Sequence, residues 1–343
     1  MGNDRAAAAE AEADDDDDNK KKMRGVGSFY NHLMMFVWLG IIHLVLVLVG
    51  VAVYFLPHPA AVSTLAALVV LSFTPNKAPY PKWGMSIAGA ITRAAAHYFP
   101  LSMEWEDEAA YLAAAEKGTP TVIGLEPHSV LTLSIISFGN YFFFTKSTPQ
   151  CVRNSRALAT GTIFVFPLLR QLWTWLGMDP ISRTKMRKLL EQKRTVLIIP
   201  GGVAECLEMK PGVETIYLRK RFGFVKVAIQ TGAQLVPAFT FGQCNTYKYY
   251  RLGPPLCSLK MVAAIASVMR VAPIFFWGKW GTPIPHQAPM HTVVGKAIPV
   301  RKNDNPTNEE VEAKLKEFID AMETLFMKHR GRHGFGKTQL VIS

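Results

Sequence analysis

The feature that most constrains this chain is a pair of apolar segments close to its N-terminus. Residues 33–56 carry no formal charge over 24 positions, which is long enough for a helix to cross the hydrocarbon core of a bilayer. A second uncharged segment, residues 60–74, follows the short joint Pro57-His58-Pro59. Because the joint is so short, we expect residues 25–75 to form a transmembrane or membrane-embedded helical hairpin. The alternative is one span followed by a buried core helix.

Charged residues on either side of these segments predict their orientation. Residues 1–24 form a low-complexity tail, acidic and then basic, which we expect to be disordered. Its last five positions contain three lysines and Arg24, and Lys77 and Lys82 follow the second apolar segment. Since cytosolic flanks of membrane segments are rich in Lys and Arg, the pattern predicts that both termini lie on the cytosolic side.

The remaining residues, 76–343, are expected to form one catalytic α/β domain. Short runs of apolar and β-branched residues alternate with helical patterns, as in folds whose strands are buried on both faces. One helix is predicted over residues 182–193, and another begins near Asn305, the expected N-cap, with Pro306 in its first turn. The predicted strands are residues 121–125, 195–199, 225–229 and 235–239.

The net charge of +12 conceals a more basic body, because residues 1–18 carry eight acidic side chains against one basic side chain. A basic body suits an anionic partner, such as nucleic acid, an anionic lipid surface or a phosphate-rich cosubstrate. A basic surface that only maintains solubility is the alternative. The sequence has no zinc-finger spacing, RNP-like aromatic run or basic region leading into heptads, so we do not expect nucleic acid as a partner.

The four cysteines are spread along the chain without a CxxC pair. This spacing predicts neither a disulfide framework nor a metal site, and we expect unpaired thiols in a reducing compartment. The cysteines are Cys151, Cys206, Cys244 and Cys257.

Two further motif matches lack the structural context that their chemistry needs. Residues 331–338 satisfy the P-loop pattern, but a predicted amphipathic helix precedes them and only five residues follow, so they cannot open a phosphate-binding helix. Residues 84–88 resemble a degraded nucleophile elbow around Ser86, without the final glycine or the strand-to-helix position of that motif. We therefore expect neither a P-loop nor a serine hydrolase.

The run Glu126-Pro127-His128-Ser129 directly follows the predicted strand 121–125. Ligands in α/β folds bind at the carboxyl ends of strands, and Pro127 restricts the backbone that presents the imidazole. Because histidine titrates near neutral pH, His128 is a candidate general base. A lone histidine can equally be a structural residue, so this run does not decide the function alone.

A second loop, residues 200–205 (PGGVAE), follows the predicted strand 195–199 in the same way. Gly201 and Gly202 let the backbone approach a ligand closely and expose amide groups to an anion. Glu205 adds a carboxylate just beyond them. An ordinary strand-to-loop turn would use the same glycines.

A basic run follows at Arg219, Lys220 and Arg221, beside the aromatic residues that flank Gly223. These positive charges could bind phosphates while the neighbouring rings stack on a base. The alternative is a solvated turn.

Taken together, these runs resemble the diacylglycerol acyltransferase type 2 family, over nearly everything from about residue 30 to the end. The tetrapeptide resembles the plant form, because animal members carry His where Glu126 stands. The matching pieces are the paired apolar segments, Tyr98-Phe99-Pro100, EPHS at 126–129, the stretch around Arg170, Gly177, Ser182 and Arg183, PGGxxE at 200–205, the run borne by Arg221, Gly223, Phe224, Ala228, Gly232, residues 235–237, Phe241 and Gly242, and residues 293–298.

The resemblance implies a glycerolipid acyltransferase-like fold, with a mixed sheet flanked by helices, and transfer of an acyl group from acyl-CoA to diacylglycerol, giving triacylglycerol. His128 would be the base, and the amides of Gly201 and Gly202 would stabilise the oxyanion. Acyl-CoA would be a cosubstrate, without a further cofactor. Pro127, Ser129 and Arg183 would line the substrate site. The location implied is the endoplasmic reticulum membrane, with the catalytic domain cytosolic, and lipid-droplet contact and a homo-oligomer are further expectations.

One departure concerns the group that orients the imidazole. Related glycerolipid acyltransferases use His-x4-Asp, whereas this chain has Leu133 at that position. Glu205 is the better candidate for a positioning carboxylate, and Glu126 the weaker one, since animal relatives replace it.

Two other functions stay open from the sequence. Monoacylglycerol or a long-chain alcohol presents the same hydroxyl as diacylglycerol, so the acceptor is not specified. A non-catalytic lipid-binding protein of the membrane or lipid droplet is the alternative outside the enzymes, although it would have no need of a base.

Overall fold

The computed structural model describes residues 29–74, 76, 80–139, 141–142, 148–210, 212–254, 257–269 and 272–343. The predicted acidic and basic tail, residues 1–24, lies outside the described residues, and so does Lys77. The predictions made for these positions stay predictions.

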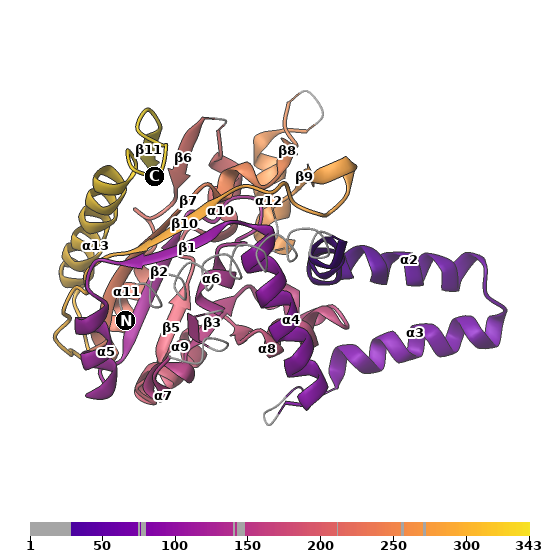
Figure 1. Cartoon of the computed structure of the whole chain (residues 1–343), viewed down its shortest axis with the longest axis horizontal. Helices are drawn as coiled ribbons and strands as arrows, with labels where there is room; N and C mark the ends of the chain where they lie inside the picture. The colour runs from indigo at the N-terminus through magenta and orange to yellow at the C-terminus, as the bar shows by residue number, and fades with distance from the viewer. Residues whose placement is uncertain are drawn as a thin grey trace, which may run out of the picture.

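A seven-stranded sheet forms the centre of the body, with the strand order β1-β10-β7-β2-β5-β3-β4 (Figure 1). All neighbouring strands are parallel except β10 and β7, which are antiparallel. The predicted mixed α/β sheet is therefore confirmed. The strands are β1 (Leu101–Trp105), β2 (Thr121–Glu126), β3 (Arg156–Ala159), β4 (Met178–Pro180), β5 (Thr195–Ile198), β7 (Gln234–Phe241) and β10 (Met290–Val294).

Helices cover both faces of this sheet because successive side chains of the strands point to opposite faces. Along β2, Val122 packs into one apolar cluster with α9 (Arg183–Glu191), α11 (Phe222–Thr231) and α13 (Asn308–His329). Ile123 packs into another with α5 (Glu108–Glu116), α6 (Ile135–Gly139) and α7 (Gln150–Arg153). The central strands are thus buried on both sides, as their continuous apolar runs predicted.

Two local predictions were wrong. Residues 225–229 form part of α11, not a strand. Their buried side chains, Val225, Ala228 and Ile229 among them, face the cluster with α9 and α13, and Gly232 ends the helix in the left-handed region (φ 67°). Packing of this face outweighed the strand preference of the β-branched residues. The last helix is capped by Thr307, whose side chain accepts from the Glu310 amide, and not by Asn305.

The other elements surround the carboxyl ends of the parallel strands or lie at the margins. The C-terminal residues form β11 (Gln339–Ile342), which pairs with β6 (Val213–Ile216), and β8 (Lys248–Arg251) pairs with β9 (Ile274–Trp277). Residues 331–338 are turns after α13 and Ser86 lies within a helix, as expected when both motif matches were rejected. The remaining helices are α4 (Lys82–Tyr98), α8 (Leu169–Trp175), α10 (Gly202–Glu208), α12 (Leu259–Met269) and the 3-10 helices Gly161–Val165, Gln243–Asn245 and Lys279–Gly281.

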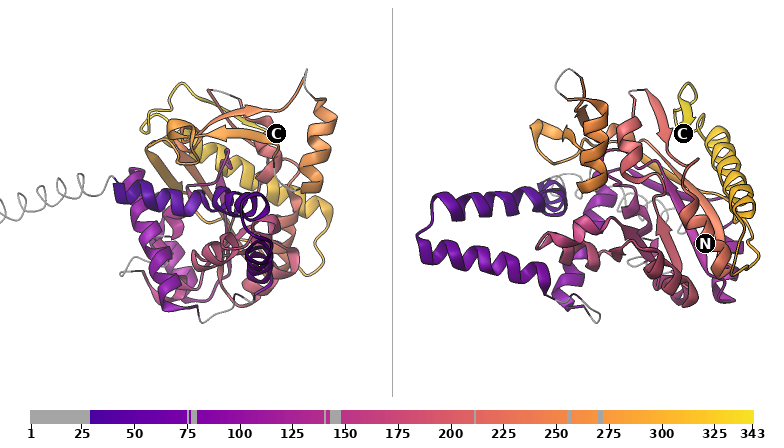
Figure 2. Two further views of the ribbon diagram at one scale, coloured as in Figure 1. Left: turned by 90° about the vertical axis from the view of Figure 1, so that its right-hand side faces the viewer. Right: turned by 180° about the vertical axis from the view of Figure 1, so that it is seen from behind.

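The N-terminal segments form a helical arm that projects from the body. The arm consists of α2 (Ile41–Tyr54) and α3 (His58–Phe73), which lie side by side in all three views (Figures 1 and 2). A preceding N-terminal helix, Phe29–Leu39, is bent by 68° from α2. The uncharged stretch 33–56 is therefore not one continuous helix. Among the described residues, no single helix is long and apolar enough to cross a membrane, although this bent pair passes the test together by length and composition.

The bend at Gly40 has a packing reason. Met35 and Trp38 of the N-terminal helix are buried in a cluster with α4 and α8, so this helix belongs to the body. A Cβ at Gly40 would come within 2.5 Å of the Phe36 carbonyl oxygen, so a side chain would not fit this turn without a shift. The arm beyond it exposes many apolar side chains, for example Leu46, Val51 and Val70.

Candidate functional site

The loops after three adjacent parallel strands meet at one edge of the sheet. In the order β7-β2-β5, the central strand leads to His128, β5 leads to Gly201 and β7 leads to Gln243. The carboxyl ends of parallel strands lie at the same edge, which is where α/β folds bind ligands. Sheet order therefore brings together residues that are more than 40 positions apart in the chain.

The His128 ring has one nitrogen in a fixed arrangement. Its Nδ1 lies 2.8 Å from the carbonyl oxygen of Ser129 and 3.2 Å from Cys206 Sγ, and the residue is only partly buried. Because a carbonyl only accepts hydrogen bonds, Nδ1 carries the hydrogen and the lone pair is on Nε2. This tautomer is the one that a base acting through Nε2 requires.

The side chain of Glu205 supports the His128 loop by binding backbone amides of that loop. Its Oε1 accepts from the amides of His128 and Ser129, the latter at 3.2 Å, and its Oε2 accepts from the Tyr217 amide at 3.4 Å. These hydrogen bonds therefore join the carboxylate to backbone N–H groups and not to the imidazole. Glu205 lies beside the His128 loop, where a positioning carboxylate was predicted. The predicted contact with the imidazole ring is wrong, because the hydrogen bonds go to the backbone.

Glu126 lies beside Glu205 and forms a fully buried carboxyl pair with it. Its Oε1 accepts from the Gly201 amide at 2.8 Å. Burial, and then the negative charge of Glu205, raise the pKa of Glu126 well above its ordinary value. Burial also raises the pKa of Glu205, but the backbone amides of His128 and Ser129 favour its charged form. Glu126 is thus the protonated partner and Glu205 the carboxylate.

The glycine loop is built around this carboxyl pair. The Gly201 amide is occupied by Glu126, which contradicts its predicted role as an oxyanion donor. A Cβ at position 201 would overlap the Glu205 carboxylate, so glycine is required here for close approach. Gly202 is the first residue of α10, at φ 57°. The role of its amide as a donor to the oxyanion stays a prediction.

Of the basic run, the structure brings Arg221 alone to this site. Its guanidinium donates to the Gly201 carbonyl at 2.5 Å and lies 4.8 Å above the Tyr217 ring. Its positive charge partly offsets the rise in the pKa of Glu126. Arg219 is exposed and donates to the Ile342 carbonyl at 3.0 Å, and Lys220 is exposed in the turn before α11. Gly223 lies in the first turn of α11.

Arg183 lies at the same edge of the sheet but farther along it. It begins α9 just after β4, and its side chain is exposed. With β5 and β3 between β4 and β2, the strand spacing places it about 14 Å from the end of β2. It is not in contact with the His128 loop in this arrangement.

Gln243 is a site residue that the sequence reasoning missed. Fully buried, it donates through Nε2 to the carbonyls of Pro127 and His128, the latter at 3.2 Å, and accepts from the Ser134 amide at 2.7 Å. It holds the His128 loop from the side opposite Glu205. Its position directly after the predicted strand 235–239 and Phe241-Gly242 was the available signal, but only the strand order shows that β7 borders β2.

Leu133, which stands where related enzymes have aspartate, is buried in the apolar cluster around α4 and α8. Cys206 is buried next to it in that cluster and contacts the Ser129 carbonyl at 3.1 Å. Burial raises the pKa of this thiol, so it stays protonated and acts as a weak hydrogen-bond donor. The group therefore has one candidate base, His128, held by a carboxylate, an amide and a thiol. Such an arrangement can take a proton from a hydroxyl that approaches Nε2.

Comparison with known proteins identifies the class. The family model for diacylglycerol acyltransferase matches residues 53–343. The chain is 31% identical over 234 residues to mouse acyl-CoA wax alcohol acyltransferase 2, covering 64% of this chain and 69% of that protein. It is 30% identical over 235 residues to human diacylglycerol O-acyltransferase 2, covering 64% of this chain and 59% of the human protein. The solved structure of the LPA acyltransferase PlsC from Thermotoga maritima aligns at 10% identity with a TM-score of 0.42, over 89% of this chain and 95% of that one.

This chain is accordingly an acyltransferase. It belongs to the diacylglycerol acyltransferase type 2 family, which confirms the resemblance inferred from its motifs. The plant character of the EPHS run stays a prediction.

Proposed function

We propose that this protein transfers a fatty acyl group from acyl-CoA to the free hydroxyl of diacylglycerol and forms triacylglycerol. The observation that carries the proposal is the His128 imidazole, whose Nδ1 is bound to the Ser129 carbonyl at the carboxyl edge of the sheet. The family supports an acyl acceptor of the acylglycerol or alcohol type.

In this reaction His128 Nε2 takes the proton of the acceptor hydroxyl as its oxygen attacks the thioester carbonyl. The tetrahedral intermediate has a negative oxygen, for which the Gly202 amide is the candidate donor. When the carbon–sulfur bond breaks, the imidazolium returns the proton to the leaving thiolate of CoA. The balance requires no covalent enzyme intermediate, and Glu205 and Gln243 act only by holding the His128 loop.

The basic run is the proposed contact for the phosphates of acyl-CoA. Arg219 and Lys220 are exposed next to Arg221, which reaches the Gly201 carbonyl. Positive charge at this place would attract the CoA moiety while its thioester lies near His128.

The arm is the proposed membrane anchor. At 1.5 Å per residue, its two helices of 14 and 16 residues are about 21 and 24 Å long, shorter than a hydrocarbon core of about 30 Å. Their exposed apolar side chains favour insertion that enters and returns on the same side. We propose the endoplasmic reticulum membrane, with both termini and the catalytic domain cytosolic, and contact with lipid droplets and a homo-oligomer as further properties.

The deciding experiment gives the purified protein radiolabelled acyl-CoA with diacylglycerol, monoacylglycerol or a long-chain alcohol, and resolves the products by thin-layer chromatography. We expect triacylglycerol as the main product and its loss in His128→Ala. Larger transfer to an alcohol or monoacylglycerol would assign the alternative acceptor. Binding of lipid with no transfer to any acceptor would favour a non-catalytic lipid-binding protein.

A further inference from the structure

A cavity of about 530 Å³ lies where the arm meets the body. This volume is within the range of about 300–1,000 Å³ that ligand sites occupy. Its wall is made by the N-terminal helix, both helices of the arm, α4 and α8, and the described residues that line it include no charged side chain. The wall includes Leu44 of α2, Leu71 of α3, Ile87 of α4, and Gln171 and Trp175 of α8.

Two polar atoms in this apolar wall have no hydrogen-bond partner in the described part of the chain. They are Gln171 Oε1, an acceptor, and Trp175 Nε1, a donor, and both are buried. The other end of the Gln171 amide is used, because its Nε2 donates to the Leu71 carbonyl at 2.8 Å. A buried polar atom without a partner costs about 1–3 kcal/mol. Both atoms are covered by neighbouring protein atoms, so a ligand in the cavity reaches them only after the two side chains turn towards it. A ligand that supplies both a hydroxyl and a carbonyl would then remove both costs.

The position of the cavity favours a ligand that comes from the membrane. Leu44 and Leu71 line it from the arm, which exposes many of its other apolar side chains and extends away from the sheet (Figure 1). A neutral lipid in the bilayer could enter here without leaving apolar surroundings. Acyl-CoA would bring phosphate charges to a wall whose described lining residues include no cation, whereas the exposed basic run lies at the edge of the sheet.

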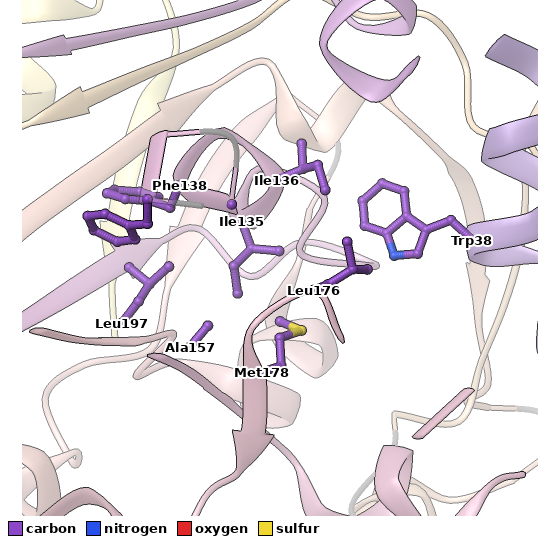
Figure 3. A pocket seen from close by; sticks show the side chains of 10 residues that line it. Trp38, Ile135, Ile136, Phe138, Ala157, Leu176, Met178 and Leu197 are labelled. Atoms are coloured by element: carbon purple, nitrogen blue, oxygen red, sulfur yellow. The ribbon is translucent and has the colours of Figure 1, made fainter. Parts of the chain in front are cut away.

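Continuous apolar packing joins the wall of this cavity to the His128 loop. Ile41 and Leu172 line the cavity and belong to the same packed cluster as Val130, Leu133 and Cys206. Beside it, Trp38 faces Leu176 and Ile136 across a second apolar cavity of about 20 Å³ (Figure 3). The N-terminal helix and α8 thus form the partition between the large cavity and the interior.

We propose that the large cavity is the loading site for a neutral acylglycerol acceptor, diacylglycerol. There an acyl chain lies along the apolar wall, and the Gln171 and Trp175 side chains turn towards the ligand, so that its hydroxyl donates to Gln171 Oε1 and an ester carbonyl accepts from Trp175 Nε1. The lipid then advances through the partition to His128. This inference rests on the proposed function for the identity of the acceptor, but the binding itself can be measured without catalysis.

The test uses the full-length protein in nanodiscs with a diacylglycerol that carries a photoactivatable diazirine in one acyl chain. Leu44→Trp fills the cavity from α2, and Ile87→Trp fills it from α4; these side chains are 43% and 37% exposed, so folding should tolerate the change. Val47→Trp is the matched control, since Val47 lies on α2, is 59% exposed and does not line the cavity.

We expect labelling within residues 36–44 or 168–175, about tenfold weaker in both filling variants and unchanged in the control. The KM for diacylglycerol should rise in the filling variants while the KM for acyl-CoA does not. Equal labelling of Leu44→Trp and Val47→Trp, or displacement by long-chain acyl-CoA and not by unlabelled diacylglycerol, would overturn the proposal. His128→Ala should keep full labelling. Site-specific labelling in a wild-type protein without transferase activity would support this site and refute the proposed function.

Discussion

The carboxyl pair beside the His128 loop leads to a contrast between two conservative substitutions, Glu126→Gln and Glu205→Gln. Glu126 is the protonated partner, so a glutamine there can still accept from the Gly201 amide and donate to Glu205. Glu205 is the ionised partner and accepts from three backbone amides, including those of His128 and Ser129. A glutamine there has no charge, and its side-chain NH₂ group would face a backbone N–H, so that two donors would meet.

The expected magnitudes differ accordingly. Loss of charge-assisted hydrogen bonds and one unpaired amide should lower the free energy of unfolding of Glu205→Gln by about 2–5 kcal/mol, a large part of the usual total of about 5–15 kcal/mol. Displacement of His128 by about 1 Å would also lower kcat about 100-fold. Glu126→Gln should lose less than about 1 kcal/mol and keep most of its activity.

The assay is thermal unfolding in detergent together with triacylglycerol synthesis at saturating acyl-CoA. Wild-type stability should also fall as the pH rises from about 4.5 towards the raised pKa of Glu126. The unfolded chain releases this proton over that range while the folded chain retains it, so folding must take up a proton. This slope should shrink in Glu126→Gln. Equal damage from both substitutions, or an unchanged slope, would refute the assignment of the proton to Glu126.

Four other variants test neighbouring contacts. The double change Arg219→Ala with Lys220→Ala should raise the KM for acyl-CoA with little change in the melting temperature, since both side chains are exposed; an unchanged KM would remove them from cosubstrate binding. Arg221→Ala should lower the melting temperature as well, because it loses the bond to the Gly201 carbonyl, and a normal melting temperature would contradict this. Gly201→Ala should abolish activity and reduce folded yield, because its Cβ overlaps Glu205; normal kinetics would show that the loop can shift. Cys206→Ser should retain activity within about threefold, since a hydroxyl also donates to the Ser129 carbonyl, and complete inactivation would point to a role for sulfur.

The structure also changes the interpretation of the arm. From the sequence, the uncharged run over residues 33–56 looked like one helix of membrane-spanning length. In the fold its first part packs on the body through Met35 and Trp38, and the chain bends at Gly40. The side chains that pack on the body and those of the exposed arm are equally apolar, so hydropathy could not separate them.

Local patterns were sufficient for the strands that build the site. The continuous apolar runs before His128 and Gly201 predicted β2 and β5, because a strand buried on both faces needs apolar residues on both. The motifs on the loops that follow were sufficient for the family. The run over residues 225–229 was ambiguous for the same reason, since a short apolar stretch has no period that separates a buried strand from a buried helix.

Tertiary structure decided which groups meet. The order β7-β2-β5 brings Gln243 and Glu205 to the two sides of the His128 loop, and sequence spacing contains no information about that order. It also decided that Glu205 binds the backbone amides of His128 and Ser129 and that Glu126 retains the proton, because both depend on burial and on distances between loops. The sequence by itself determined that His128 is the candidate base, since the residue type and its place after a strand are local. How that base is held is a property of the folded sheet.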